Sequence, residues 1–152
     1  MVMRWLYGLC LLGLLASSTL VHADAASRLV ERYVQALQQR DDTALAALLT
    51  EDTRIKVTLL MGQEPPMVIS LTCAEYLQQQ RALWNFASDH AVTVGDRSVS
   101  EKGEGASVTF EQKERYKLLQ GTLNRNSQMT LRTRSRDGKS IITEIQARIR
   151  QW

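Results

Sequence analysis

Cysteine, histidine and proline are scarce in this sequence, and each shortage excludes a class of protein. The 152 residues include two cysteines, two histidines and two prolines. Two cysteines cannot form the several bridges of a disulfide-stabilised scaffold, and a structural zinc site needs three or four ligands. The sequence also has no phosphate-binding glycine loop and no nucleophile elbow. We therefore expect a globular chain with no metal and no cofactor.

Residues 1–23 have the features of a cleavable signal peptide. Arg4 supplies a positive charge, Trp5–Leu20 carries no charge and is rich in leucine, and the segment ends in Val21-His22-Ala23. The most apolar part is shorter than the roughly 20 residues that span a bilayer. We expect cleavage near Ala23 and a periplasmic or secreted protein, residues 24–152, without a transmembrane segment. The alternative is an uncleaved N-terminal anchor.

Charge is distributed unevenly over the rest of the chain. Residues 24–114 contain 14 acidic and 9 basic residues, whereas residues 115–152 contain 2 acidic and 9 basic ones. Four arginines of the basic part alternate with apolar residues and would share one outer sheet face: Arg132, Arg134, Arg148 and Arg150. One hypothesis is an interaction face for an envelope protein, anionic lipid head groups or a second copy of the chain. The alternative is a solvated face that resists aggregation. We expect no nucleic-acid partner, because few aromatic residues lie between these charges.

The first half of residues 24–152 is mainly helical. Apolar residues recur at helical spacing over 25–39, and Asp41 or Asp42 can cap a second, short helix. Alternation then predicts a strand at 53–61, and a short apolar run predicts another at 67–71. Thr72-Cys73-Ala74-Glu75 has capping-box spacing and opens a third helix that extends to about residue 88.

The second half consists of strands. They are expected at 90–100, 106–119, 122–136 and 140–151, with turns at Gly103-Glu104-Gly105, Gly121 and Asp137-Gly138 and a bulge or bend at Gly95-Asp96. Strands that follow helices, with tight turns between them, are typical of an α+β domain whose antiparallel sheet carries helices on one face.

This order of elements resembles the nuclear transport factor 2-like superfamily, which includes ketosteroid isomerase and limonene-epoxide hydrolase. The best local match covers residues 31–37 and continues through Asp41 and Asp42 to Leu48-Leu49-Thr50-Glu51-Asp52. The resemblance implies a cone-shaped, bent antiparallel sheet, with about three helices from the N-terminal half on its concave face and a pocket inside.

The isomerase residues of that superfamily match this chain only in part. Tyr33 is similar to the tyrosine that helps form the oxyanion hole. The catalytic base falls closest to Val57, and the acid on a late strand falls near Ser127 or Gln128. Two of the three roles are unfilled, so we expect a module without this chemistry, and fold alone does not decide function.

One face of the predicted strand 106–118 is apolar except for Gln112 and Glu114. A polar side chain on such a face loses free energy unless it is paired. These two residues therefore indicate a pocket wall, with Glu114 as a base or a ligand contact. Two alternatives remain: the sheet flares so that both side chains reach water, or Glu114 pairs with Arg125 on the next strand.

Four aromatic residues belong on elements that face the same pocket: Tyr33, Tyr76, Trp84 and Tyr116. They can line a site for a small apolar ligand, or they can be ordinary core residues. Our first hypothesis is an exported module that binds a small apolar molecule or a protein. The second is a pocket enzyme that uses Glu114 and a tyrosine for acid–base chemistry. The third is an envelope-complex subunit that binds through its basic sheet face.

Overall fold

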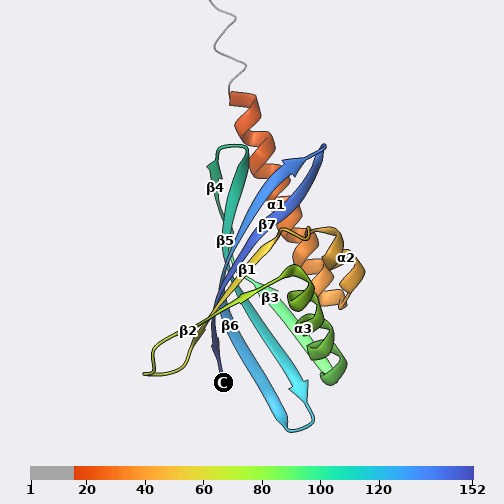
Figure 1. The fold of residues 1–152 in the computed structure, drawn as a ribbon, viewed down its shortest axis with the longest axis vertical. Helices are drawn as coiled ribbons and strands as arrows, with labels where there is room; N and C mark the ends of the chain where they lie inside the picture. The colour runs from red at the N-terminus through yellow and green to blue at the C-terminus, as the bar shows by residue number, and fades with distance from the viewer. Residues whose placement is uncertain (1–15) are drawn as a thin grey trace, which may run out of the picture.

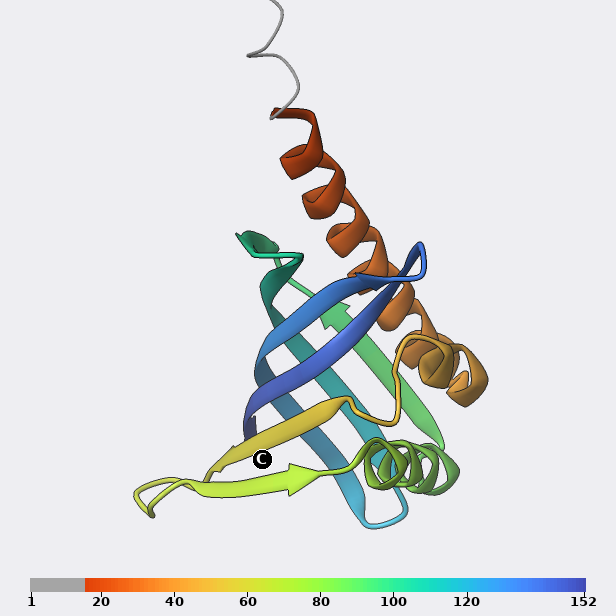
Figure 2. The same ribbon diagram turned by 45° about the horizontal axis from the view of Figure 1, so that its top comes forward.

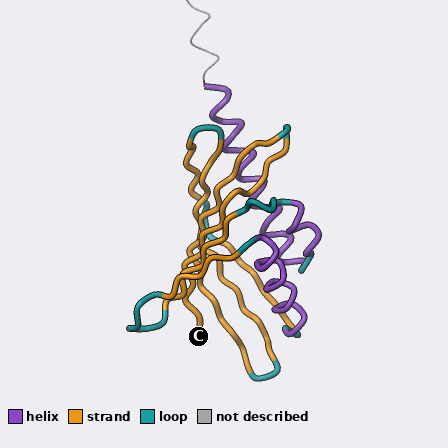
Figure 3. The backbone as a smooth tube through the Cα atoms, viewed as in Figure 1, coloured by secondary structure: helices purple, strands orange, loops and turns teal. Residues whose placement is uncertain are grey.

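The structure, a computed structural model, describes residues 16–152 (Figures 1 and 3). These residues form three helices and seven strands. The helices are α1 (Ala16–Gln39), α2 (Asp42–Ala47) and α3 (Cys73–Phe86). The strands are β1 (Arg54–Leu60), β2 (Met67–Leu71), β3 (Asp89–Val94), β4 (Ser98–Lys102), β5 (Gly105–Leu118), β6 (Gly121–Arg136) and β7 (Lys139–Gln151).

The seven strands form one mixed sheet, in the order β2-β1-β7-β6-β5-β3, with β4 paired to β5. The prediction of an α+β fold is confirmed, but the prediction of a wholly antiparallel sheet was wrong. β1 and β7 run parallel, with Ile55 opposite Ile145 and Val57 opposite Ala147. β7 pairs antiparallel with β6, and this pairing sets the direction in which β7 runs beside β1. Alternation of side chains is the same in either direction, so it could not reveal this pair.

The single strand expected at 90–100 is two strands, β3 and β4. Both pair with β5, β3 along residues 112–117 and β4 along residues 105–109. Between them, the backbone N–H of Gly95 donates to the carbonyl oxygen of Glu111 at 2.9 Å. The bend expected at Gly95-Asp96 therefore divides the strand and lets the sheet change direction.

The helices cover the concave face of the bent sheet. In Figure 2 the sheet curls beside α1 and α3, and the β1–β2 hairpin projects away from them. α1 packs on β3 to β7, whereas α3 packs on β1, β2 and α2. Fully buried side chains from both layers form the core, including Leu29, Leu37, Val108, Leu131 and Ile145. The predicted inward faces of the helices and strands thus meet in one core.

Local contacts fix where the helices begin and how they are joined. The Asp41 carboxylate accepts from the Ala44 N–H at 2.9 Å and caps α2. Thr72 and Glu75 form the predicted capping box at the start of α3. After α1, Arg40 has a φ of 53° and its guanidinium donates to the carbonyl oxygen of Ala87 at 3.0 Å. This contact ties the end of α1 to the end of α3, so the two helices hold a common position over the sheet.

The predicted signal peptide lies mostly outside the described residues. Its last eight positions belong to the first turns of α1, and Ala26 is the first buried residue of that helix among the described side chains. Cleavage at Ala23 would therefore leave the described core contacts of α1 in place, but cleavage itself stays a prediction. From residue 16 onward, no helix is both long and apolar enough to cross a membrane.

Candidate functional site

A cavity of about 210 Å³ lies between the concave face of the sheet, α1 and α3. One side of it is aliphatic. The side chains there come from β1, β2, β6 and β7: Ile55, Val57, Leu59, Ile69, Leu71, Met129, Ile145, Ala147 and Ile149. The other side is polar and is formed by helix tyrosines and by strands β5 and β6. The cavity is thus amphipathic, and it is smaller than the roughly 300–1,000 Å³ of pockets for drug-sized ligands.

Two tyrosines from different helices meet at the cavity wall. Tyr33 of α1 and Tyr76 of α3 are buried, and their hydroxyl oxygens are 3.0 Å apart. Burial raises the pKa of Tyr33 well above its ordinary value, and the neighbouring Tyr76 adds to this. Burial also raises the pKa of Tyr76, although its hydrogen bond with Tyr33 partly opposes the shift. Both hydroxyls therefore keep their protons at neutral pH. One of them donates to the other, and the second is free to donate to a ligand.

Glu114 lies on the cavity wall opposite the helices and is 7% exposed. The Tyr116 hydroxyl donates to its Oε1 at 2.6 Å, and Nε2 of His90 is 3.5 Å from the same oxygen. Burial alone would raise the pKa of Glu114. The contacts with His90 and Tyr116 and the positive charge of Arg125 outweigh burial and hold that pKa below its ordinary value. The carboxylate is therefore ionised, and neither contact uses its Oε2.

His90 supports this carboxylate from behind. Its ring stacks on Tyr116 with centroids 4.2 Å apart and an interplanar angle of 10°. The side chain is fully buried and does not line the cavity. Burial and the charge of Glu114 raise the pKa of Tyr116, so this tyrosine remains a donor to the carboxylate. His90 and Tyr116 thus hold Glu114 in place, and the carboxylate is the group that a ligand can reach.

The structure brings together most of the predicted pocket residues. Tyr33, Tyr76, Gln112 and Glu114 line the cavity, whereas Tyr116 lies directly behind Glu114. Trp84 is buried but is not among the lining residues. The two alternatives for Glu114 do not describe its position, since the side chain is neither solvent-facing nor in a direct ion pair with Arg125. Arg125 stands opposite Glu114 in register, with its guanidinium 5.6 Å from the centre of the Tyr116 ring.

Sequence reasoning did not include His90, Arg125 and Ser127 among the pocket residues, although it placed Ser127 near an isomerase position and Arg125 beside Glu114. His90 stands opposite Tyr116 because β3 pairs with β5, and this register is not visible in the sequence. Alternation along β6 does place Arg125 and Ser127 on the same face as Met129 and Leu131, and this pattern could have identified them. Val57 and Ser127, which align with two isomerase positions, also line the cavity, whereas Gln128 is exposed.

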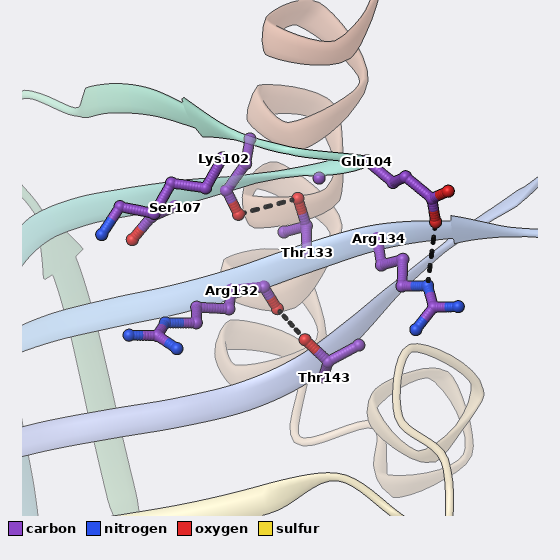
Figure 4. A pocket seen from close by; sticks show the side chains of 9 residues that line it. Lys102, Glu104, Ser107, Arg132, Thr133, Arg134 and Thr143 are labelled. Atoms are coloured by element: carbon purple, nitrogen blue, oxygen red, sulfur yellow. Dashed lines mark hydrogen bonds and ion pairs between the residues drawn. The ribbon is translucent and has the colours of Figure 1, made fainter.

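The predicted arginine face lies on the outer side of the sheet. Arg132, Arg148 and Arg150 follow the register of outward-facing positions, and Arg132 is 3.3 Å from the Glu144 carboxylate. A groove of about 360 Å³ between β4, β5, β6 and β7 includes Arg132 and Arg134, and Figure 4 shows Arg134 joined to Glu104 there. Both arginines already have acidic neighbours, so a partner on this face stays a prediction.

No group of three or more possible metal ligands occurs among the residues that the structure describes. The polar groups at the cavity are hydrogen-bonding and charged side chains. Together they can accept a proton or a hydrogen bond at Glu114 and donate hydrogen bonds from Arg125 and from one of the two tyrosines.

Solved structures with similar architecture place this geometry in a known fold. A candidate scytalone dehydratase from Novosphingobium aromaticivorans superposes with a TM-score of 0.72 at 15% identity, covering 89% of this chain and 88% of that one. The hexachlorocyclohexane dehydrochlorinase LinA-type3 from Novosphingobium barchaimii superposes with a TM-score of 0.70 at 14% identity. The match covers 88% of this chain and 90% of that one. A candidate dehydratase of the NTF2-like family from Streptomyces avermitilis superposes with a TM-score of 0.65 at 15% identity. The match covers 86% of this chain and 96% of that one.

The chain has the nuclear transport factor 2-like cone fold. The resemblance inferred from the order of elements is thereby confirmed at the level of fold. No family model matches the sequence, and no curated protein matches it. At these identities the likeness shows the fold alone, so the role of this cone-shaped domain rests on its own residues.

Proposed function

We propose that this chain is an exported domain whose cone binds a small, largely apolar molecule with one polar end. The observation that carries the proposal is the division of the cavity into an aliphatic wall and a polar wall. Val57, Leu59 and Ile69 are only partly buried although they lie inside the cone, so they leave apolar surface available to a ligand. The leader pattern of residues 1–23 supports export.

Filling the cavity is expected to abolish ligand retention. Val57→Phe adds an aromatic ring on the cavity wall, whereas Lys56→Phe adds the same ring on the opposite face of β1. Native mass spectrometry of protein recovered from the periplasm should show the mass of residues 24–152 with a bound small molecule for the wild type and for Lys56→Phe. Val57→Phe should carry no adduct.

Two outcomes would argue against the proposal. A wild-type mass without any adduct, in protein that also fails to bind small apolar probes, would remove ligand binding as the function. A mass that still includes residues 1–23 would separate the two parts of the proposal, because export with cleavage would then fail while binding could stand.

A second candidate function is acid–base catalysis in the same cavity. The specific observation is that an ionised carboxylate, Glu114, faces a space that also receives protonated tyrosines, which is the arrangement required for proton abstraction. Two of the structural neighbours are named for eliminations, dehydration and dehydrochlorination, and such reactions remove a proton from carbon. Glu114 would take this proton at Oε2, and Tyr33 or Tyr76 would donate to the oxygen on which negative charge develops.

Exchange of a carbon-bound proton tests this candidate. In D₂O, the α-protons of 2-heptanone should exchange for deuterium faster in the presence of the wild-type protein than in buffer alone. Proton NMR follows the exchange as a loss of the α-proton signal. Glu114→Gln should slow the protein-dependent exchange by about 100-fold, because general-base catalysis contributes roughly 10²–10⁴. Glu111→Gln, on the outer face of the same strand, should leave the rate unchanged. Equal rates for the wild type and Glu114→Gln would exclude Glu114 as the base for this probe.

A further inference from the structure

Four polar side chains occupy adjacent positions on the concave face of β5 and β6. Gln112 stands opposite Ser127, and Glu114 stands opposite Arg125 in the antiparallel register. All four line the cavity, and we call them the polar quartet. They concentrate hydrogen-bonding groups on one small area of the sheet, beside the aliphatic wall.

Two atoms of the polar quartet are buried without a partner in the described part of the chain. These atoms are Oε1 of Gln112, whose residue is 3% exposed, and Nε of Arg125. A buried polar atom that lacks a hydrogen bond costs roughly 1–3 kcal/mol. Ser127 stands opposite Gln112 and Glu114 stands opposite Arg125, but neither forms a hydrogen bond with the unpaired atom of its neighbour. Both side chains line the cavity, so a small rotation of either would turn its unused atom toward a group that enters it.

The unused atoms differ in what they require. Oε1 of Gln112 accepts hydrogen bonds and Nε of Arg125 donates one. Oε2 of Glu114, which takes no part in the contacts with Tyr116 and His90, is also an acceptor. A complementary group must donate to Gln112 or Glu114 and accept from Arg125 at the same time.

This requirement excludes three common head groups. A carboxylate offers only acceptors and would face the negative charge of Glu114. A ketone accepts from Arg125 but leaves Oε1 of Gln112 unpaired. An ammonium group donates to Glu114 but meets the positive charge of Arg125. A neutral carboxamide, with an N–H and a C=O on neighbouring atoms, satisfies both kinds of atom.

We infer that the ligand of this cavity has a short aliphatic body and a neutral head group of the carboxamide type, bound by Gln112, Glu114 and Arg125. This inference rests on the proposed binding function and names the chemical class of its ligand. The body lies against the aliphatic wall of β1, β2 and β7, and the volume of about 210 Å³ keeps it short.

Four probes with similar bodies test the head group: hexanamide, hexanoate, hexylamine and 2-heptanone, titrated into the protein of residues 24–152 by calorimetry or by ligand-observed NMR. Hexanamide should bind at least about tenfold more tightly than each of the others, a difference equivalent to about 1.4 kcal/mol. Gln112→Leu should reduce its advantage over 2-heptanone to less than about threefold, because the apolar side chain has no acceptor to leave unpaired. Glu111→Gln, on the outer face of β5, should keep the wild-type preference.

The outcomes separate the inference from the proposed function. Equal binding of all four probes would mean that water, and not the head group, forms hydrogen bonds with the polar quartet. The inference would then fail, whereas the proposed binding function would stand. Tightest binding of hexanoate or hexylamine would also overturn the inference, because one charge of the quartet would then dominate. Binding of none of the probes would contradict the proposed function and the inference together. Circular dichroism of each variant establishes that it is folded before its affinity is compared.

Discussion

Replacement of Glu114 by alanine is expected to lower the free energy of unfolding by about 3 kcal/mol, the upper end of the cost of leaving a buried hydrogen-bonding group without its partner. The carboxylate accepts a short hydrogen bond from Tyr116 and lies within ion-pair distance of His90. Without it, the Tyr116 hydroxyl loses its acceptor inside the protein. Arg125 at the same time loses the negative charge that stands opposite it in register.

The matched control is Glu111→Ala on the same strand. Glu111 contacts Asn126 and Lys113 on the outer face, where exposed pairs contribute at most about 1 kcal/mol. Urea unfolding at pH 7, followed by circular dichroism, should therefore show a much larger loss for Glu114→Ala. Equal losses for the two variants would contradict the view that Glu114 is held by buried contacts.

Acid provides a second readout of the same contacts. The pKa of Glu114 in the folded protein lies below its ordinary value of 4.5, so its contribution to stability is fully present above pH 4.5. That contribution is lost as the pH falls through the lower, folded value. The stability difference between the wild type and Glu114→Gln should therefore shrink below pH 4.5. A difference that stays constant down to pH 2 would show that the charge of Glu114 does not stabilise the fold.

Substitution of Gly105 by alanine is expected to have a comparable effect, a loss of about 3 kcal/mol, for a steric reason. Gly105 begins β5 and stands opposite Arg134 of β6. A Cβ at this position would lie 2.0 Å from the carbonyl oxygen of Thr133, so the backbone of one strand must move. The Thr133 hydroxyl donates to the carbonyl oxygen of Ala106 at this same point, and this contact would be displaced as well.

Gly95→Ala is the control for this substitution. A Cβ there would meet the nearest atom, Cβ of Glu111, at 3.7 Å, which is ordinary van der Waals contact. Thermal unfolding should show a midpoint lowered by about 10 °C for Gly105→Ala, taking about 3–4 °C per kcal/mol at this size, and little change for Gly95→Ala. Similar midpoints for both variants would mean that β5 and β6 separate at this end without cost.

The local features of the fold were predictable from short stretches of sequence. The capping box at Thr72 and Glu75 and the cap at Asp41 placed two helix starts. The turn at Asp137-Gly138 separates β6 from β7, and both of its residues have positive φ, which matches their side chains. Alternation along β5 put Gln112 and Glu114 on the inner face, and both line the cavity. Each of these features depends on residues only a few positions apart.

The parts that were not predictable depend on strand register and direction. The parallel pairing of β1 with β7 brings together residues about 90 positions apart, and no local pattern records it. His90 likewise became part of the site only through the pairing of β3 with β5. For Trp84 the sequence left two alternatives, a pocket wall or the core, and the packing of α3 placed it in the core.

By itself, the sequence determined the kind of domain: its helices, its strands, the inward faces of both and two polar residues in an apolar interior. It also predicts the leader of residues 1–23, which the described structure does not test. Only the tertiary structure decided that Tyr33 meets Tyr76, that His90 and Tyr116 hold Glu114, and that Gln112 and Arg125 each keep an unpaired atom at the cavity. The physical reason is that periodicity and capping act over one or two turns or strands, whereas a site is assembled from hydrogen bonds between segments that register alone brings together.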